Sequence, residues 1–143
     1  MWSAKVVLAC ALNLLGRSAD SLPPVAFVNV APADVSSHAE AYVRVNDSHI
    51  FLLTSGPNFV RLQRGKDLCG DLDAARQLAS VLVHEEAHLK YGADERQAYQ
   101  AQLTTLAFLG APAGTRVYSQ VFKSMQRALA QPKPRPDRII VLR

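Results

Sequence analysis

One segment, residues 71–91, sets the architecture of this chain: DLDAARQLASVLVHEEAHLKY. Its apolar residues recur every three or four positions, which is the period of an α-helix with one buried face. The Asp71 carboxylate can accept hydrogen bonds from the first-turn amides, and Gly92 is the residue type that tolerates a left-handed C-terminal cap. The sequence therefore predicts one long helix from Asp71 to about Tyr91.

Two more helices are predicted after this segment. Asp94 can cap a second helix, whose apolar residues keep a helical spacing until the glycines and proline of residues 110–114 end it. A third helix is predicted over residues 115–129, because an apolar residue stands at every fourth position from Val117 to Leu129. The C-terminal half of the chain is therefore expected to be mainly helical.

Strands are predicted before the long helix. Residues 25–30 form one candidate, and residues 41–45 and 49–54 form two more on either side of turn residues 46–48. The latter two strands are expected to pair as a hairpin, and residues 56–58 to break the pattern. The order of elements favours an α+β fold, with a short antiparallel or mixed sheet packed beside the long helix and two further helices.

The composition excludes several classes of protein. The chain has 143 residues, of which 49% are hydrophobic and 20% charged, so it is not an intrinsically disordered sequence. No apolar run approaches the roughly 18 residues that span a bilayer. We expect residues 1–143 to form one domain, which at this length buries roughly two-thirds of its unfolded surface. Such a core folds without a metal, so a metal site here need not be structural.

The basic character of the chain does not indicate a nucleic-acid partner. The net charge is +4, but the densest basic cluster lies in the proline-rich tail at residues 132–143. Aromatic residues make up only 7% and do not alternate with the basic ones. We therefore expect a solvated tail and no nucleic-acid binding.

The N-terminal segment, residues 1–20, has two interpretations. Lys5 followed by an apolar run resembles a signal peptide, but a cut after Ala19 would place Arg17 where a small residue is required. The alternative, which we favour, is a buried helix that ends at Gly16.

The two cysteines, Cys10 and Cys69, are expected to be reduced. They can pair only if the first segment is retained in an oxidising compartment. A cytoplasmic location is favoured, and secretion is the alternative if residues 1–19 are a signal peptide.

The chemically informative motif is HEEAH at residues 84–88. On a helix, His84 and His88 project about 40° apart and one turn apart along the axis, so both rings can bind one metal ion at about 2.0–2.1 Å. Glu85 stands on the flank of the same face, where a general base can take a proton from water. Glu86 points about 100° further round and is expected to be solvated or an outer partner.

Glu95 is the candidate third ligand. If the helix continued past His88, Glu95 would lie about 10 Å further along the axis. Gly92 allows a turn that can bring the first turn of the next helix back to the metal. Glu95, Ala98 and Tyr99 then share one face of that helix. The other interpretation is that an acid in a first turn simply interacts well with the helix dipole.

The motif resembles that of the gluzincin zinc metallopeptidases, above all the very small members of that clan. The resemblance rests on His84-Glu85-x-x-His88 followed by a glutamate on a second helix, and covers roughly residues 72–100. It implies a zincin-like fold and a peptide or protein substrate. It also implies that His84, His88 and Glu95 bind Zn²⁺ while Glu85 is the general base.

Two further family roles have candidates here. The edge strand that pairs with substrate would be the stretch at residues 49–54. The group that stabilises the transition state would be Tyr99, with Tyr91 and Tyr118 as alternatives that no motif separates from it. The gap between the second histidine and the glutamate is shorter than in the large gluzincins, so the connection must be a tight turn.

Asp94 is the alternative third ligand, because it lies at the spacing that metzincins use. Those enzymes need a glycine where Tyr91 stands, and Met125 belongs to a predicted helix and not to a methionine-containing turn. His38 is expected at the surface, and His49 is expected to be an ordinary strand residue.

The sequence thus predicts zinc-dependent hydrolysis of peptide bonds. The alternative is a metal-binding interaction or regulatory module on a peptidase-like scaffold, without turnover. In a third, purely structural interpretation, the two histidines are ordinary helix residues.

Overall fold

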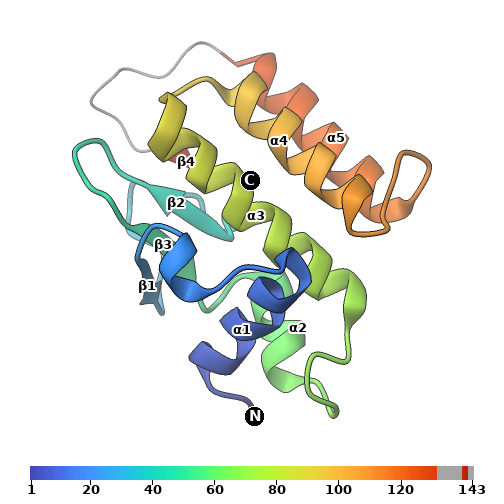
Figure 1. Cartoon of the computed structure of the whole chain (residues 1–143). Helices are drawn as coiled ribbons and strands as arrows, with labels where there is room; N and C mark the ends of the chain where they lie inside the picture. The colour runs from blue at the N-terminus through green and yellow to red at the C-terminus, as the bar shows by residue number, and fades with distance from the viewer. Residues whose placement is uncertain (132–139, 142–143) are drawn as a thin grey trace.

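Helix α3 (Leu72–Tyr91) runs through the middle of the molecule, between the sheet on one side and two helices on the other (Figure 1). It begins where the Asp71 carboxylate accepts a hydrogen bond from the Ala74 amide, at 3.0 Å. It ends at Gly92, whose φ of 89° is accessible to glycine without strain. The predicted helix and both of its ends are confirmed.

The computed structural model describes residues 1–131 and 140–141. Within them it contains five α-helices, a short 3₁₀ turn and a mixed four-stranded sheet, an α+β arrangement as predicted. The helices other than α3 are α1 (Ala4–Leu15), α2 (Pro57–Arg64), α4 (Glu95–Phe108) and α5 (Arg116–Leu129). The 3₁₀ turn is Ala19–Ser21.

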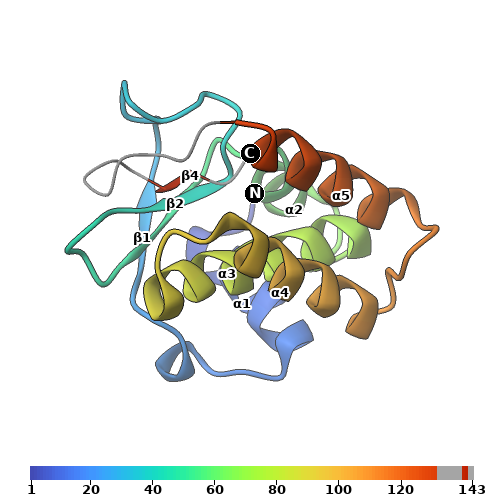
Figure 2. The ribbon, with the colours of Figure 1, turned by 90° about the horizontal axis from the view of Figure 1, so that it is seen from above.

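Helices α4 and α5 form a layer beside α3, with α4 in the middle (Figure 2). Asp94 caps α4 by accepting from the Gln97 amide at 3.2 Å, as predicted. Leu103 and Leu106 of α4 belong to the main hydrophobic core, together with Leu78 and Leu82 of α3. This packing places the first turn of α4 against the last turns of α3.

The sheet has the strand order β1-β3-β2-β4. The strands are β1 (Val25–Val28), β2 (Ala41–Val43), β3 (Ile50–Leu53) and β4 (Ile140–Val141). Strands β2 and β3 form the predicted antiparallel hairpin, whereas β1 pairs with β3 in parallel. The expectation that the stretch at residues 49–54 supplies a free edge is wrong, because β3 is paired on both sides. The far side of β2 pairs with β4.

Helix α2 is the element that the sequence analysis missed. We expected Pro57 to end the regular secondary structure. Instead it occupies the first helical position, where its missing N–H would have no intrahelical partner anyway. Phe59 and Leu62 then lie three residues apart and are both buried in the core. Two apolar residues are too short a pattern to predict a helix when a glycine and a proline, which usually indicate a turn, stand directly before them.

Residues of the N-terminal segment form helix α1, with part of its surface buried, as in the buried-helix interpretation. It packs against α3 and ends at Gly16, with φ 64°. The expectation of reduced cysteines is wrong, because Cys10 of α1 and Cys69 form a disulfide with a Cα–Cα distance of 5.5 Å. Such a bond is typical of a non-reducing compartment and does not favour the cytoplasm.

In the described part of the chain, no helix is both long enough and apolar enough to cross a bilayer. Most of the basic tail at residues 132–143 lies outside the described residues, apart from the two residues of β4.

Candidate metal centre

The two histidines of α3 turn toward each other in the interior of the protein. His84 and His88 are 0% and 3% exposed, and their Nε2 atoms are 3.1 Å apart. The four-residue spacing places both rings on one face of the helix, as predicted. Burial of two polar rings at one point needs a partner that compensates for the lost water.

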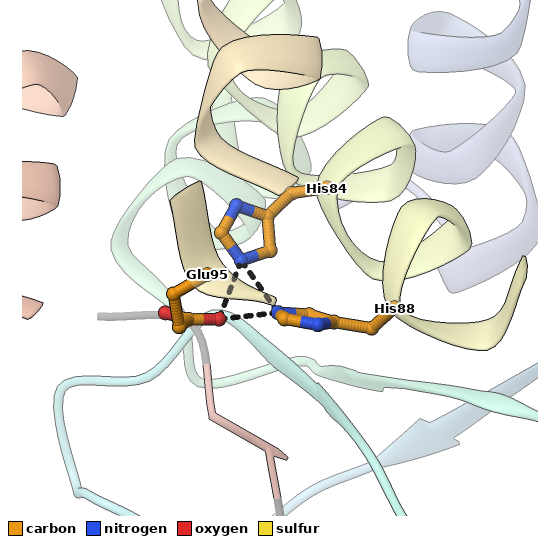
Figure 3. Close-up of side chains that lie close together, drawn as sticks. All are labelled: His84, His88 and Glu95. Carbon is orange, nitrogen blue, oxygen red and sulfur yellow. Dashed lines mark hydrogen bonds and ion pairs between the residues drawn. The ribbon is translucent and has the colours of Figure 1, made fainter. Parts of the chain in front are cut away.

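Glu95 supplies a carboxylate at the same point. The tight turn after Gly92 reverses the chain, so the first residue of α4 faces the last turns of α3 (Figure 3). Its Oε1 lies 3.4 Å from His84 Nε2 and is also in contact with His88 Nε2. The three ligand atoms all lie within 4.8 Å of one another. The group can therefore hold one metal ion.

Hydrogen bonds on the other side of each ring settle which nitrogens face this point. His84 Nδ1 lies 2.8 Å from Gln102 Oε1, and His88 Nδ1 lies 2.9 Å from the Gly92 carbonyl oxygen. Because both partners are acceptors, both Nδ1 atoms carry the proton in the neutral rings. The two Nε2 lone pairs then converge on each other and on the Glu95 carboxylate. Converging lone pairs repel one another unless a cation lies between them.

The donor set fits zinc. Two imidazole nitrogens and one carboxylate oxygen are a frequent ligand set of catalytic zinc sites, which leave a fourth position open. The outer hydrogen bonds of the rings also match metal sites, where a ligating histidine gives its other N–H to an acceptor.

Gln102 is a site residue that the sequence analysis did not single out. Its Nε2 donates to Ser80 Oγ at 3.3 Å, and Ser80 Oγ donates to the Gln77 carbonyl oxygen at 2.7 Å. This chain of bonds holds the Gln102 oxygen toward His84. The signal was available, because Gln102 lies two helical turns after Glu95 and hence on the same face.

Tyr99 packs edge-on against the ring of His84, with ring centroids 4.5 Å apart. It is buried between α3 and α4. The contact restricts the orientation of the His84 ring.

The charge states of the cluster suit metal binding. Burial lowers the pKa of His84, and the Glu95 carboxylate offsets this shift only in part. The lowered pKa keeps the His84 ring neutral near pH 7. Burial alone would raise the pKa of Glu95, but the neighbouring His84 and His88 rings lower it to about 2. Metal ligands must be neutral imidazole and ionised carboxylate, so no proton has to leave.

Glu85 is fully buried beside this cluster. Among the described residues, neither of its carboxylate oxygens has a hydrogen-bond partner. Burial raises the pKa of Glu85 well above its usual range, and the negative charge of Glu95 raises it further. A carboxylate with a raised pKa is suited to taking a proton from water near neutral pH.

Glu86 is not the solvated residue that its position suggested. It is 7% exposed and accepts two hydrogen bonds from the Arg17 guanidinium, at 2.8 and 2.7 Å. Arg17 follows α1, so the pair ties the N-terminal segment to α3. The bonds from Arg17 lower the pKa of Glu86 despite its burial.

The remaining candidates lie outside the cluster. Asp94 is exposed and caps α4, so the structure brings Glu95 and not Asp94 to the histidines. Tyr91 is exposed, and Tyr118 lies on α5. His49 is exposed as well, with Nδ1 2.9 Å from Asp47 Oδ1, and the described cluster contains neither it nor His38.

Comparison with known proteins found no matching family model, no similar curated protein and no similar solved structure. The functional argument therefore rests on the residues themselves.

Proposed function

We propose that this chain is a zinc-dependent metallopeptidase of the gluzincin type. The observation that supports the proposal is the convergence of two buried Nε2 lone pairs and the Glu95 carboxylate. Beside them lies the buried Glu85, whose carboxylate has no hydrogen-bond partner in the described part of the chain. Hydrophobic packing does not account for four such polar groups in one place, because each costs free energy when it is buried unpaired. A bound cation and a reacting water would account for all four.

His84, His88 and Glu95 would hold the zinc, which when bound lowers the pKa of water and polarises a carbonyl group. Glu85 takes a proton from the attacking water and passes it to the leaving amine nitrogen. The raised pKa of Glu85 gives its carboxylate a proton affinity suited both to taking the proton from water and to giving it to the amine. Gln102 holds the His84 ring in the orientation that leaves Nε2 free. The ring contact of Tyr99 with His84 favours the same positioning role over stabilisation of the transition state.

A second function, metal binding without turnover, is favoured by the complete burial of Glu85. A general base must meet both water and substrate, and in this structure its carboxylate is enclosed. A regulatory or interaction module on this scaffold would need only the three ligands.

One variant pair separates the two functions. We would measure zinc content and cleavage of a broad peptide library for the wild-type chain, Glu85→Gln and the neighbouring Glu86→Gln. The peptidase proposal expects one zinc per chain in all three and a rate loss of about 10²–10⁴-fold in Glu85→Gln alone.

The other outcomes are equally informative. Full zinc content without cleavage by any of the three proteins would favour the non-catalytic module. Equal cleavage by Glu85→Gln and wild type would exclude Glu85 as the base, and the absence of zinc would exclude both functions.

A further inference from the structure

A pocket of about 230 Å³ lies next to the proposed metal centre. It forms where α3, α4, α5, the start of α2 and the segment before β2 meet. Val81, Tyr99 and Gln102 line its buried part, and Glu40, Asn58 and Arg61 line another side. None of these residues is a proposed metal ligand.

Two residues that line the pocket contact His84 of the proposed metal centre. Gln102 is hydrogen-bonded to His84, and Tyr99 packs on the ring of the same histidine. Val81 precedes Glu85 by four residues, about one turn or 6 Å along α3. If a peptide were held over the metal ligands, one of the peptide's neighbouring side chains could thus reach this pocket.

The volume fits one side chain better than a whole ligand. Small-molecule sites in proteins usually enclose about 300–1,000 Å³, and this pocket is smaller. Its lining combines the aliphatic Val81 and the aromatic Tyr99 with the carboxylate of Glu40, as a long side chain with a charged tip would need.

Glu40 gives the pocket a negative charge that the protein does not neutralise. Within residues 1–131 and 140–141, its two carboxylate oxygens accept hydrogen bonds only from Asn58, from the backbone amide at 3.0 Å and from the side-chain amide at 2.9 Å. No cation of the described residues forms an ion pair with it. Burial raises the pKa of Glu40, and Arg61 opposes this only through its longer-range charge.

Glu40 is half-buried, and charges that are partly withdrawn from water are usually paired with an opposite charge. Asn58 satisfies the hydrogen-bonding capacity of Glu40 but leaves the charge in place, because an amide is neutral. Arg61 is an exposed residue, so solvent and salt screen its repulsion of an incoming cation more than they screen the attraction of Glu40.

We propose that this pocket receives the lysine or arginine side chain of a peptide substrate, with Glu40 as the residue that selects it. The inference rests on the proposed peptidase function for its biological meaning. Its physical content, cation selectivity at Glu40, is independent of cleavage.

The test measures binding without turnover, in the zinc-loaded full chain carrying Glu85→Gln. The probes are the N-acetyl amides of arginine, lysine, norleucine and glutamate, titrated by NMR. We expect the two cationic probes to bind at least about tenfold more tightly than norleucine, with glutamate the weakest. Adding Glu40→Gln should abolish the difference, whereas the matched change Arg61→Gln should preserve it.

Salt provides a second measurement that needs no change at Glu40. The preference for cationic probes should decline as salt increases, because Glu40 attracts them electrostatically. Equal binding of arginine and norleucine, tighter binding of glutamate, or a preference that survives Glu40→Gln would overturn the proposal.

Cleavage by the wild-type chain separates this proposal from the function that it extends. Cation-selective binding without any cleavage would defeat the peptidase function and leave the pocket's selectivity standing. Cleavage without preference for lysine or arginine near the scissile bond would defeat the selectivity and leave the peptidase function standing.

Discussion

The two halves of α3 are both packed inside the protein but differ in the polarity of the side chains that they bury. The N-terminal half is residues 72–80, and the C-terminal half is residues 81–91. The first half buries aliphatic residues such as Leu78 and Ala79 against the core. The second half buries His84, Glu85 and two further polar residues, Glu86 and His88. Burial of apolar area stabilises the fold, whereas burial of a polar group costs free energy unless a partner compensates.

The difference shows for which half the stability of the fold is enough to explain the buried residues. The first half packs into the main hydrophobic core, which residues of α1, α2 and α4 share. In the second half, Arg17 accounts for Glu86. Glu85 has no hydrogen-bond partner among the described residues, and the Nε2 atoms of His84 and His88 face each other and the Glu95 carboxylate. Substitutions near the first half should therefore change the free energy of unfolding, and substitutions in the second should change metal binding.

The largest expected effect on stability comes from the disulfide. Replacing both Cys10 and Cys69 by serine should lower the free energy of unfolding by about 2–5 kcal/mol, because the bond closes a long loop of the unfolded chain. Urea denaturation measures the loss. Zinc stoichiometry of the folded variant should be unchanged. An equal loss of zinc would show that the two regions are not independent.

The largest effect on metal binding should come from Glu95→Gln, because Glu95 is the only carboxylate of the described cluster. We expect zinc affinity to fall by more than about 100-fold, since loss of an outer partner alone costs 10–100-fold. Competition with a chelating dye measures it. Asp94→Asn is the matched control and should bind zinc as wild type does. A loss confined to Asp94→Asn would reverse the assignment of the third ligand.

Gln102→Leu should weaken zinc binding by about 10–100-fold, because His84 loses the acceptor that fixes its Nδ1 proton. The exposed Gln100 on the same helix provides the control, as Gln100→Leu. Isothermal titration with zinc compares the two. Equal affinities would mean that the hydrogen bond from Gln102 does not orient the ligand.

Arg17→Met tests whether Glu86 contributes to the stability of the fold, as the buried residues of the N-terminal half of α3 do. The change leaves the buried Glu86 carboxylate with the more distant ammonium of Lys90, whose Nζ is 3.9 Å from Glu86 Oε2. It should cost about 1–3 kcal/mol of unfolding free energy, less than for a fully buried pair because Arg17 is partly exposed. Adding Glu86→Gln should recover part of the loss. A double variant as unstable as the sum of the two single ones would show no coupling.

The smallest effect concerns pH and Glu40. Its pKa is raised above the ordinary 4.5 in the folded protein, so the folded state favours the protonated carboxyl. The resulting stability is present below pH 4.5 and is lost as the pH rises through the folded pKa. Wild type should therefore lose stability relative to Glu40→Gln as the pH rises from 4.5 through the folded pKa of Glu40, as measured by urea denaturation. A difference that does not change with pH would contradict the assignment.

Local patterns predicted the elements that position the site. The caps Asp71 and Asp94, and the stop at Gly92, are signals within a few residues of the helix ends that they determine. The cluster of His84, His88 and Glu95 followed from helical spacing and one turn. Such features depend on neighbouring residues and so can be found in a single sequence.

Features that depend on distant partners could not be predicted in the same way. Glu86 pairs with Arg17, 69 residues earlier, and this contact turns an expected surface residue into a buried one. The Cys10–Cys69 bond needs α1 to pack beside the start of α3. The interior position of β3 follows from β1 pairing in parallel on its outer side, which no local pattern signals.

The central claim is that the buried cluster binds a metal ion, and metal analysis of the purified protein tests it most directly. The wild-type chain, as isolated and after dialysis with zinc, should contain one zinc per chain, and the His84→Ala variant should contain none. A chelator should lower the melting temperature of the wild type alone, and added zinc should restore it. A wild-type chain that takes up no zinc, or a His84→Ala variant that binds as much, would contradict the account.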